Sequence, residues 1–242
     1  MTAGRRMRLW SLVVEHASGQ SAAVHHVCAA AVAVTGVNGA AVTVVLAATP
    51  RETMCASDAV ASDLEELTLT LGEGPGVDAV AAGPVLVADL STLASLARWP
   101  MYAPAAMDAG IRAVFALPLR IGAIRLGVLS LYRATPGDLD ADQLADALVL
   151  ADTACALLLD ATRPNQPRQD GRRPEPAGPH HPEIHQATGM ITVQLGVTAA
   201  VALTRLRAYA YAHDRRLRDV ARDVVARRLR FHPDRAGDRD DR

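Results

Sequence analysis

Residues 111–133 read IRAVFALPLRIGAIRLGVLSLYR, the clearest β-hairpin signal in the chain. The first half alternates with the period of a strand, and one face is predicted to hold Ile111, Ala113, Phe115, Leu117 and Leu119. Arg112 and Arg120 fall on the other face. Ile121-Gly122 is predicted as the turn before a returning strand at 125–133, and Pro118 favours a sheet edge or a bulge.

Further helices and strands are predicted around this hairpin. Residues 8–34 are typical of one or two helices, with a break near Ser18-Gly19 and an N-cap at Ser21. Strands are predicted at 39–48, 52–56 and 84–90, and helices at 62–71 and 140–160. Helices at both ends of a central antiparallel sheet predict an α+β sandwich of the sensor type.

The helix predicted at 140–160 has an apolar seam made of Leu144, Leu148, Ala151, Cys155 and Leu158. Two arrangements remain open for this seam. It packs on the sheet, or it pairs with the helix around residues 9–13 of a second subunit.

Composition narrows the class of protein. Only eight of the 242 residues are aromatic, so the core must be built from Ala, Val and Leu. The three cysteines, Cys28, Cys55 and Cys155, are far apart and form no C-x-x-C motif. This spacing argues against a thiolate zinc site, a disulfide scaffold and a redox pair, and it suits a reducing cytosol.

The formal net charge of −1 hides an asymmetry between the two parts of the chain. Residues 1–162 carry nine arginines and sixteen acids, a net charge of −7, whereas residues 163–242 carry sixteen arginines and ten acids, a net charge of +6. The chain contains no lysine. An acidic front and a basic rear indicate a two-part protein whose rear part meets a polyanion.

Two segments mimic membrane signals. The apolar stretch after Arg8 is too short for a secretion signal, and the uncharged run 27–50 is interrupted by Gly36, Asn38 and Gly39. A buried helix–turn–strand explains the second segment better than a membrane span. We therefore expect a soluble, cytoplasmic protein without a membrane partner.

A linker is predicted at 163–182, where six prolines occur in twenty residues with hardly any apolar side chain. After it, residues 183–230 are typical of three short amphipathic helices. Their predicted buried positions are Ile184, Ala187, Ile191, Leu195, Ala199, Ala202, Leu203, Leu206, Ala210, Leu217, Val220, Ala221 and Val224. Gly196 is expected to end the first helix and Thr198 to cap the second. Residues 231–242 are expected to form a disordered tail.

The rear helices carry nine arginines against four acids. Arg218 and Arg222 are expected one turn apart, opposite the stripe of Leu217 and Ala221. Tyr209 and Tyr211 add aromatic rings near this surface. Guanidinium groups together with stacking rings suit phosphates and unpaired bases, although a merely solvated helical face explains the charge pattern as well.

The front part resembles a GAF domain of the actinobacterial regulator type, over residues 8–162. The resemblance rests on LGEGPGVDA at 71–79, PVLVADL at 84–90, ALPL at 116–119 and LGVLSLY at 126–132. It implies an antiparallel sheet with helices on its faces, often enclosing a pocket for a small ligand, here unknown. Relatives often carry Cys where this chain has Gly76, which argues against thiol-based sensing there. The signature of the cyclic-nucleotide-binding members is absent.

The rear part resembles an ANTAR domain, on IHQATGM at 184–190, QLGVT at 194–198, ALTRLRAYA at 202–210 and LRDVARDVV at 217–225. This resemblance implies a three-helix module that acts as a dimer, binds paired hairpin loops in nascent transcripts and prevents a terminator from forming. Thr188 stands where many relatives have a lysine. Matching positions and charge together give the candidate RNA-binding residues Ala187, Gly189, Arg205, Arg207, Tyr211, Arg215, Arg218 and Arg222.

The sequence thus predicts a homodimeric transcription antitermination regulator, which is not an enzyme and has no cofactor or metal. Two alternatives remain open: a DNA-binding regulator, and a ligand-binding GAF protein whose rear helices mediate association. The glycines at 72, 74 and 76 indicate a turn rather than a phosphate loop, because no Lys-Ser/Thr follows. Asp138, Asp140 and Asp142 are interpreted as helix-start carboxylates rather than calcium ligands. The candidate metal or haem histidines, His25, His26, His180, His181 and His185, are interpreted as non-ligands.

Overall fold

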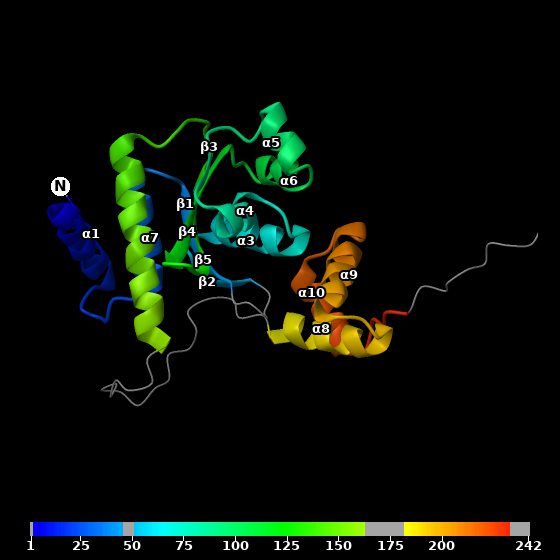
Figure 1. The fold of residues 1–242 in the computed structure, drawn as a ribbon. Coiled ribbons are helices and arrows are strands. Elements are labelled where there is room, and N and C mark those ends of the chain that lie inside the picture. Colours follow the sequence, from blue (N-terminus) through cyan, green and yellow to red (C-terminus); the bar gives the residue numbers. More distant parts are fainter. Residues whose placement is uncertain (1, 46–50, 163–181, 233–242) are drawn as a thin grey trace, which may run out of the picture. The chain divides into compact units, whose positions relative to one another are not determined.

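Five antiparallel strands in the order β2-β1-β5-β4-β3 form the centre of the first of two compact units in this computed structural model (Figure 1). The strands are β1 (Gly39–Val44), β2 (Glu52–Ala56), β3 (Val85–Val87), β4 (Ala113–Ile121) and β5 (Ile124–Arg133). The structure describes residues 2–45, 51–162 and 182–232. The first unit belongs to Met1–His180 and the second to His181–Arg242.

Helices cover both faces of the sheet (Figure 1). One face packs against α1 (Thr2–Ala17), α2 (Val24–Thr35) and α7 (Ala141–Thr162). The other packs against α3 (Ala59–Leu71), α4 (Pro75–Ala82), α5 (Leu93–Arg98) and α6 (Tyr102–Asp108). The predicted α+β class is therefore confirmed, and an apolar cluster lies on each face of the sheet.

The central hairpin forms as predicted, with two differences. Ile121 pairs with Ile124, so the two turn residues are Gly122 and Ala123, one position later than expected. Ile111 precedes the strand and packs in the cluster on the α3 side, whereas Phe115 belongs to the opposite cluster. The alternation assigned to Ile111 is wrong because the strand begins only at Ala113.

Pro118 lies where its missing N–H costs least. Strand β3 pairs with β4 only from Val114 to Ala116, so β4 is an edge strand at Pro118 on that side. A register irregularity follows between Leu119 and Arg120. Both expectations for this proline, an edge position and a neighbouring bulge, agree with the structure.

The N-terminal helices differ from the prediction in their bounds. Helix α1 begins at Thr2 rather than at residue 8, and Ala23 rather than Ser21 is the N-cap of α2. The ring of His26 explains the second difference, because its Nδ1 accepts the N–H of Ala23 at 3.0 Å. The side chain of His26, in the first turn of α2, thus caps the backbone N–H of Ala23.

The buried stripe of α7 is shifted relative to the predicted seam. Leu148 is 42% exposed, and the fully packed positions are Ala147, Leu150, Ala151, Ala154 and Cys155. Small residues let α7 lie close to α2 and the sheet, which a seam of leucines would prevent. Leu9 and Val13 of α1 are buried in the same cluster of their own chain. The seam therefore packs within the subunit.

Three helices form the second unit: α8 (Pro182–Leu195), α9 (Ala199–Ala212) and α10 (Leu217–Val225). Helices α8 and α9 meet at 106°, and α10 packs against both. Gly196, with φ of 65°, ends α8, and the hydroxyl of Thr198 accepts the N–H of Val201 at the start of α9, both as expected.

The core of this unit matches the predicted stripe with few exceptions. The fully buried positions are Ile184, Ala187, Ile191, Ala202, Leu206, Ala210, Leu217, Val220, Ala221 and Val224. Leu195 and Leu203 are half-buried. Ala199 is exposed, because the first position of α9 lies ahead of the turn that packs on its neighbours. That part of the prediction is wrong.

The second unit extends beyond residue 230. The N–H of Phe231 donates to Oε1 of Gln194 at 3.0 Å, and its ring meets that of Tyr209 edge-on. The expectation of a disordered tail starting at 231 is therefore wrong for the first two residues. Residues 233–242 and the predicted linker, except Pro182 at the start of α8, lie outside the described residues.

Within the part of the chain that the structure describes, no single helix is long and apolar enough to cross a bilayer. The bent pair α8–α9 meets such a test by length and composition only.

Candidate nucleic-acid interface

The first-helix candidates have opposite surroundings. Ala187 is completely buried and packs in the core of the second unit, so it supports the site from inside. Gly189 is exposed, and a Cβ added there would meet no atom within 4 Å. Thr188 is 7% exposed, and its hydroxyl donates to the carbonyl of Ile184 at 2.7 Å. The threonine at the usual lysine position is thus a satisfied interior residue.

Several of the predicted arginines are held by carboxylates of the same unit. Arg215 and Arg228 both bind Asp223, at 2.7 Å and 2.6 Å. The hydrogen bond to Arg215 lowers the pKa of Asp223, and the same bond raises the pKa of Arg215. These two ion pairs therefore stabilise α10, and the charge of Asp223 partly neutralises the two guanidiniums.

The third-helix pair is also engaged. Arg222 reaches Asp219 at 3.4 Å and Glu183 of α8 at 3.5 Å. Arg218 lies 3.9 Å from Asp219 and is half-buried, so its side chain does not project freely opposite the apolar stripe as predicted. Surface ion pairs of this kind are weak and exchange readily with an incoming phosphate.

The two tyrosines of α9 differ in their exposure to solvent. Tyr211 is 56% exposed and offers its ring to solvent. Tyr209 is half-buried, stacked on His213 with ring centroids 3.9 Å apart, and in contact with Phe231. Arg205 and Arg207 lie on α9, the first exposed and the second half-buried. The eight sequence candidates thus include Ala187 as a core residue and seven with at least partial access to solvent.

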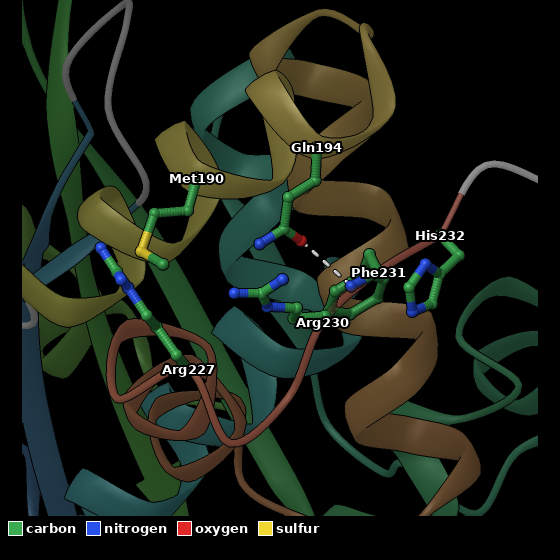
Figure 2. A pocket seen from close by; sticks show the side chains of 6 residues that line it. All are labelled: Met190, Gln194, Arg227, Arg230, Phe231 and His232. Atoms are coloured by element: carbon green, nitrogen blue, oxygen red, sulfur yellow. Dashed lines mark hydrogen bonds between the residues drawn. The ribbon is translucent and has the colours of Figure 1, made fainter.

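A hollow that the sequence did not predict lies between α8 and the segment after α10. It has a volume of about 370 Å³ and is lined by Met190, Gln194, Arg227, Arg230, Phe231 and His232 (Figure 2). The sequence signal that could have found it is the cluster of arginines followed by two rings at 227–232. What the sequence does not show is that this segment folds back onto α8.

The first unit contains a buried polar network on its α3 face. Glu65 accepts hydrogen bonds from the hydroxyls of Tyr132 and Thr43, the latter at 2.6 Å. Arg51 donates to the carbonyl of Gly76 at 3.2 Å, and a Cβ at Gly76 would come within 3.1 Å of the same guanidinium. The carboxylate of Glu65 is satisfied by these two hydroxyls, whereas Nε and one terminal nitrogen of Arg51 are buried without a hydrogen-bond partner among the described residues. We assign no ligand to this network.

Two of the three cysteines lie close together in the structure. Cys28 of α2 and Cys55 of β2 are buried free thiols whose Sγ atoms lie 2.7 Å apart. Their hydrogen bond, followed by burial, raises the pKa of Cys28 well above its usual value. Cys28 and Cys55 are thus far apart in the sequence but close in space, because distance along the chain does not report distance across a helix–sheet contact.

The glycine-rich stretch is a structural turn, as expected. Gly72 ends α3 with φ of 71°, and Gly74 is the N-cap of α4. A Cβ at Gly74 would meet the ring of Tyr102 at 3.0 Å. Glu73 between them accepts the N–H groups of Met101 and Tyr102, both at 2.8 Å, and so holds the start of α6.

The other dismissed motifs also have structural roles. Asp140 accepts the N–H of Gln143 at the start of α7, and Asp142 binds Arg5. Burial lowers the pKa of His26, whose ring caps α2. Among the described residues, no group of three or more His, Cys, Asp or Glu could hold a metal ion. His180 and His181 lie outside them.

Comparison with known proteins defines the class. Residues 18–158 match the GAF domain model and residues 179–225 match the ANTAR domain model. The chain belongs to the GAF family, with an ANTAR domain after its GAF domain. It therefore combines a sensor domain with an RNA-binding antitermination domain, the composition of a signal-transducing regulator.

Solved structures with similarity to the chain include two GAF domains of phosphoenolpyruvate-protein phosphotransferases. The domain from Coxiella burnetii is 13% identical, with a TM-score of 0.49, over 66% of this chain and 96% of that one. The domain from Acinetobacter is 12% identical, with a TM-score of 0.48, over 69% and 100%. A domain of a putative sensor histidine kinase from Sinorhizobium meliloti is 15% identical, with a TM-score of 0.44, over 55% and 86%. None of the curated proteins matches the chain.

Proposed function

We propose that this protein is a cytoplasmic, homodimeric antitermination regulator whose GAF domain controls how two ANTAR domains engage hairpin loops of one nascent RNA. The match of residues 179–225 to the ANTAR domain carries the proposal. GAF and ANTAR domains are normally non-enzymatic, and we propose that this chain performs no catalysis.

Gly189 supports RNA contact at α8. A glycine inside a helix costs about 0.5–1 kcal/mol relative to alanine, and the space beyond Gly189 is open. Packing within the unit therefore does not require the glycine. Close approach of a nucleic-acid backbone to α8 explains why the position lacks a side chain.

Control by the GAF domain needs only a change in how often two ANTAR domains are available together. Two linked domains that bind two loops of one RNA gain from effective concentration, so a small change in the dimer population alters affinity strongly. The ligand or partner that produces this change, and the direction of its effect, form no part of the proposal.

The test compares a two-hairpin RNA with duplex DNA of equal charge, using the full chain and fluorescence anisotropy. The RNA is expected to bind more tightly, with a salt slope of about −0.7 per neutralised phosphate. Arg207→Ala, Arg218→Ala and Gly189→Ala should each weaken binding. Arg125→Ala removes an equal charge from an exposed site of the GAF domain and should have little effect.

Two outcomes would support other functions. Tighter binding of duplex DNA would favour a DNA-binding regulator. Unchanged RNA affinity in the arginine variants, combined with loss of dimers in size-exclusion chromatography, would favour helices that only mediate association.

A further inference from the structure

Two of the nine arginines that the structure describes in the second unit differ from the other seven. Arg227 and Arg230 form no ion pair and no side-chain hydrogen bond with any residue that the structure describes. Arg228, between them, is bound to Asp223. Arg227 and Arg230 both line the hollow between α8 and residues 226–232 (Figure 2). Gln194 lines the same hollow from α8.

The polar groups of this hollow are mainly hydrogen-bond donors. Oε1 of Gln194 already accepts the N–H of Phe231, so one of its two lone pairs is used and the two Nε2–H donors are the larger part of what this amide offers a ligand. The guanidiniums of Arg227 and Arg230 can only donate. A ligand that fits must therefore carry several acceptor atoms, as phosphate oxygens and base edges do.

The same hollow offers apolar surface. The thioether of Met190 lies near Arg227 on one side, and the ring of Phe231 lies on the other (Figure 2). Phe231 is fixed by the hydrogen bond to Gln194 and by its edge contact with Tyr209, at a centroid distance of 5.6 Å. Unpaired bases bind to such surfaces by stacking and apolar contact, next to arginines that hold the phosphates.

The backbone at Arg227 gives independent support. Its φ is +59°, a left-handed conformation that glycine adopts without strain and other residues adopt at a cost. The position follows α10, where helices commonly end in a glycine. An arginine at such a position is strained, and strained residues concentrate at sites of function.

We propose that this hollow binds one unpaired nucleotide of the RNA, with its phosphate on Arg227 and Arg230 and its base against Met190 and Phe231. The inference rests on the proposed RNA-binding function and specifies a contact beyond it. Residues 227–232 lie outside the segment that matches the ANTAR domain, whereas Met190 and Gln194, which line the same hollow, lie inside it.

The test uses the full chain and a two-hairpin RNA enriched by the wild-type protein from a pool with randomised loops. Arg227→Gly and Arg230→Gln should each weaken binding about tenfold or more, as expected for charge-assisted hydrogen bonds. Arg228→Gln is the matched control, because it removes the same charge from an adjacent exposed residue outside the hollow. It should change affinity less than about threefold.

The glycine variant also guards against misfolding. Arg227→Gly relieves the left-handed strain, so its thermal midpoint should equal or exceed that of the wild type. Loss of RNA affinity without loss of stability then identifies a binding role. Loss of both would contradict the argument from strain and overturn the inference.

Replacing single loop nucleotides by abasic ones tests for the base. One abasic position should weaken binding to the wild type but have a smaller further effect on Arg230→Gln, because the two changes act on the same bound nucleotide and their effects are therefore coupled. Additive effects at every loop position would overturn the inference, even if the RNA still binds.

The remaining outcomes separate the two proposals. If the wild type enriches no RNA, the proposed function fails and the hollow loses its ligand with it. If RNA binds and all three arginine variants behave alike, only the inference about the hollow fails. If AMP, GMP, CMP or UMP alone binds tightly while RNA affinity is unaffected by the variants, the hollow is a site for free nucleotides and the inference is wrong.

Discussion

The hydroxyl of Tyr132, on the central strand β5, donates a hydrogen bond to the carboxylate of Glu65, on α3. Both side chains are buried, with exposed fractions of 2% and 3%. Thr43 of β1 donates a second hydrogen bond to the same carboxylate. The contact joins a helix on one face of the sheet to two adjacent strands.

Tyr132→Phe should destabilise the GAF domain by about 1–3 kcal/mol, because the buried carboxylate of Glu65 then lacks one of its donors. Tyr211→Phe removes a hydroxyl from an exposed ring and should cost almost nothing. Denaturant unfolding followed by circular dichroism measures both. Equal stability of the two variants would show that water or another donor replaces the hydroxyl of Tyr132.

Stability should fall at alkaline pH. Burial, followed by the charge of Glu65, raises the pKa of both Tyr102 and Tyr132. Below about pH 10 these tyrosines are protonated in the folded and unfolded chain alike; above it, the unfolded chain releases protons that the folded one keeps. Each tyrosine then lowers the free energy of unfolding by about 1.4 kcal/mol per pH unit.

This alkaline loss is unusually easy to assign because the chain has no lysine. Tyr132→Phe should reduce the slope of stability against pH above pH 10, while the raised pKa of Cys28 adds a loss that begins nearer pH 9 and is shared by wild type and variant. Urea unfolding across this range measures the slope. An identical slope in wild type and variant would show that Tyr132 titrates normally.

Asp146 of α7 forms ion pairs with two arginines of α1. It binds Arg8 at 2.7 Å and Arg5 at 2.8 Å and is 5% exposed. Asp146→Ala should cost about 2 kcal/mol, less than a fully buried pair, because the arginines remain accessible to water. Asp152→Ala is the control, since Asp152 and Arg6 are both exposed and 3.6 Å apart, and it should cost at most about 0.5 kcal/mol. Thermal unfolding compares the two, and equal costs would contradict the structural role of Asp146.

The burial of residues that follow the strand or helix period could be predicted from the sequence. Phe115 and Leu117 alternate with the strand period, and Leu217 and Val224 recur with the helical one, so their burial could be predicted. Leu148 shows where this fails, because which side of α7 faces the sheet depends on the close packing of alanines. Local pattern reports a face and not the partner that covers it.

The candidate interface was predictable in its charge but not in its geometry. The number of arginines predicted a cationic unit. The ion pairs of Arg215 and Arg228 with Asp223 could not be predicted, because they form only when α10 and its flanking turns fold. The left-handed turn at Arg227 brings 228–232 back across α8, and no residue in the sequence marks it, since a glycine is usual there. The hollow therefore had to come from the structure.

The three thiols should be unreactive in the folded protein. Cys28, Cys55 and Cys155 are at most 5% exposed. Burial raises the pKa of Cys155. The hydrogen bond with Cys55, followed by burial, raises the pKa of Cys28. Thiolate is the reactive form, so alkylation by iodoacetamide at pH 8 should be slow and should accelerate with denaturant as the domain opens. Mass spectrometry counts the labelled cysteines, and three should react in the fully unfolded chain. Rapid labelling of Cys28 or Cys55 without denaturant would mean that β2 separates from α2 in the native state, because neither sulfur can otherwise be reached.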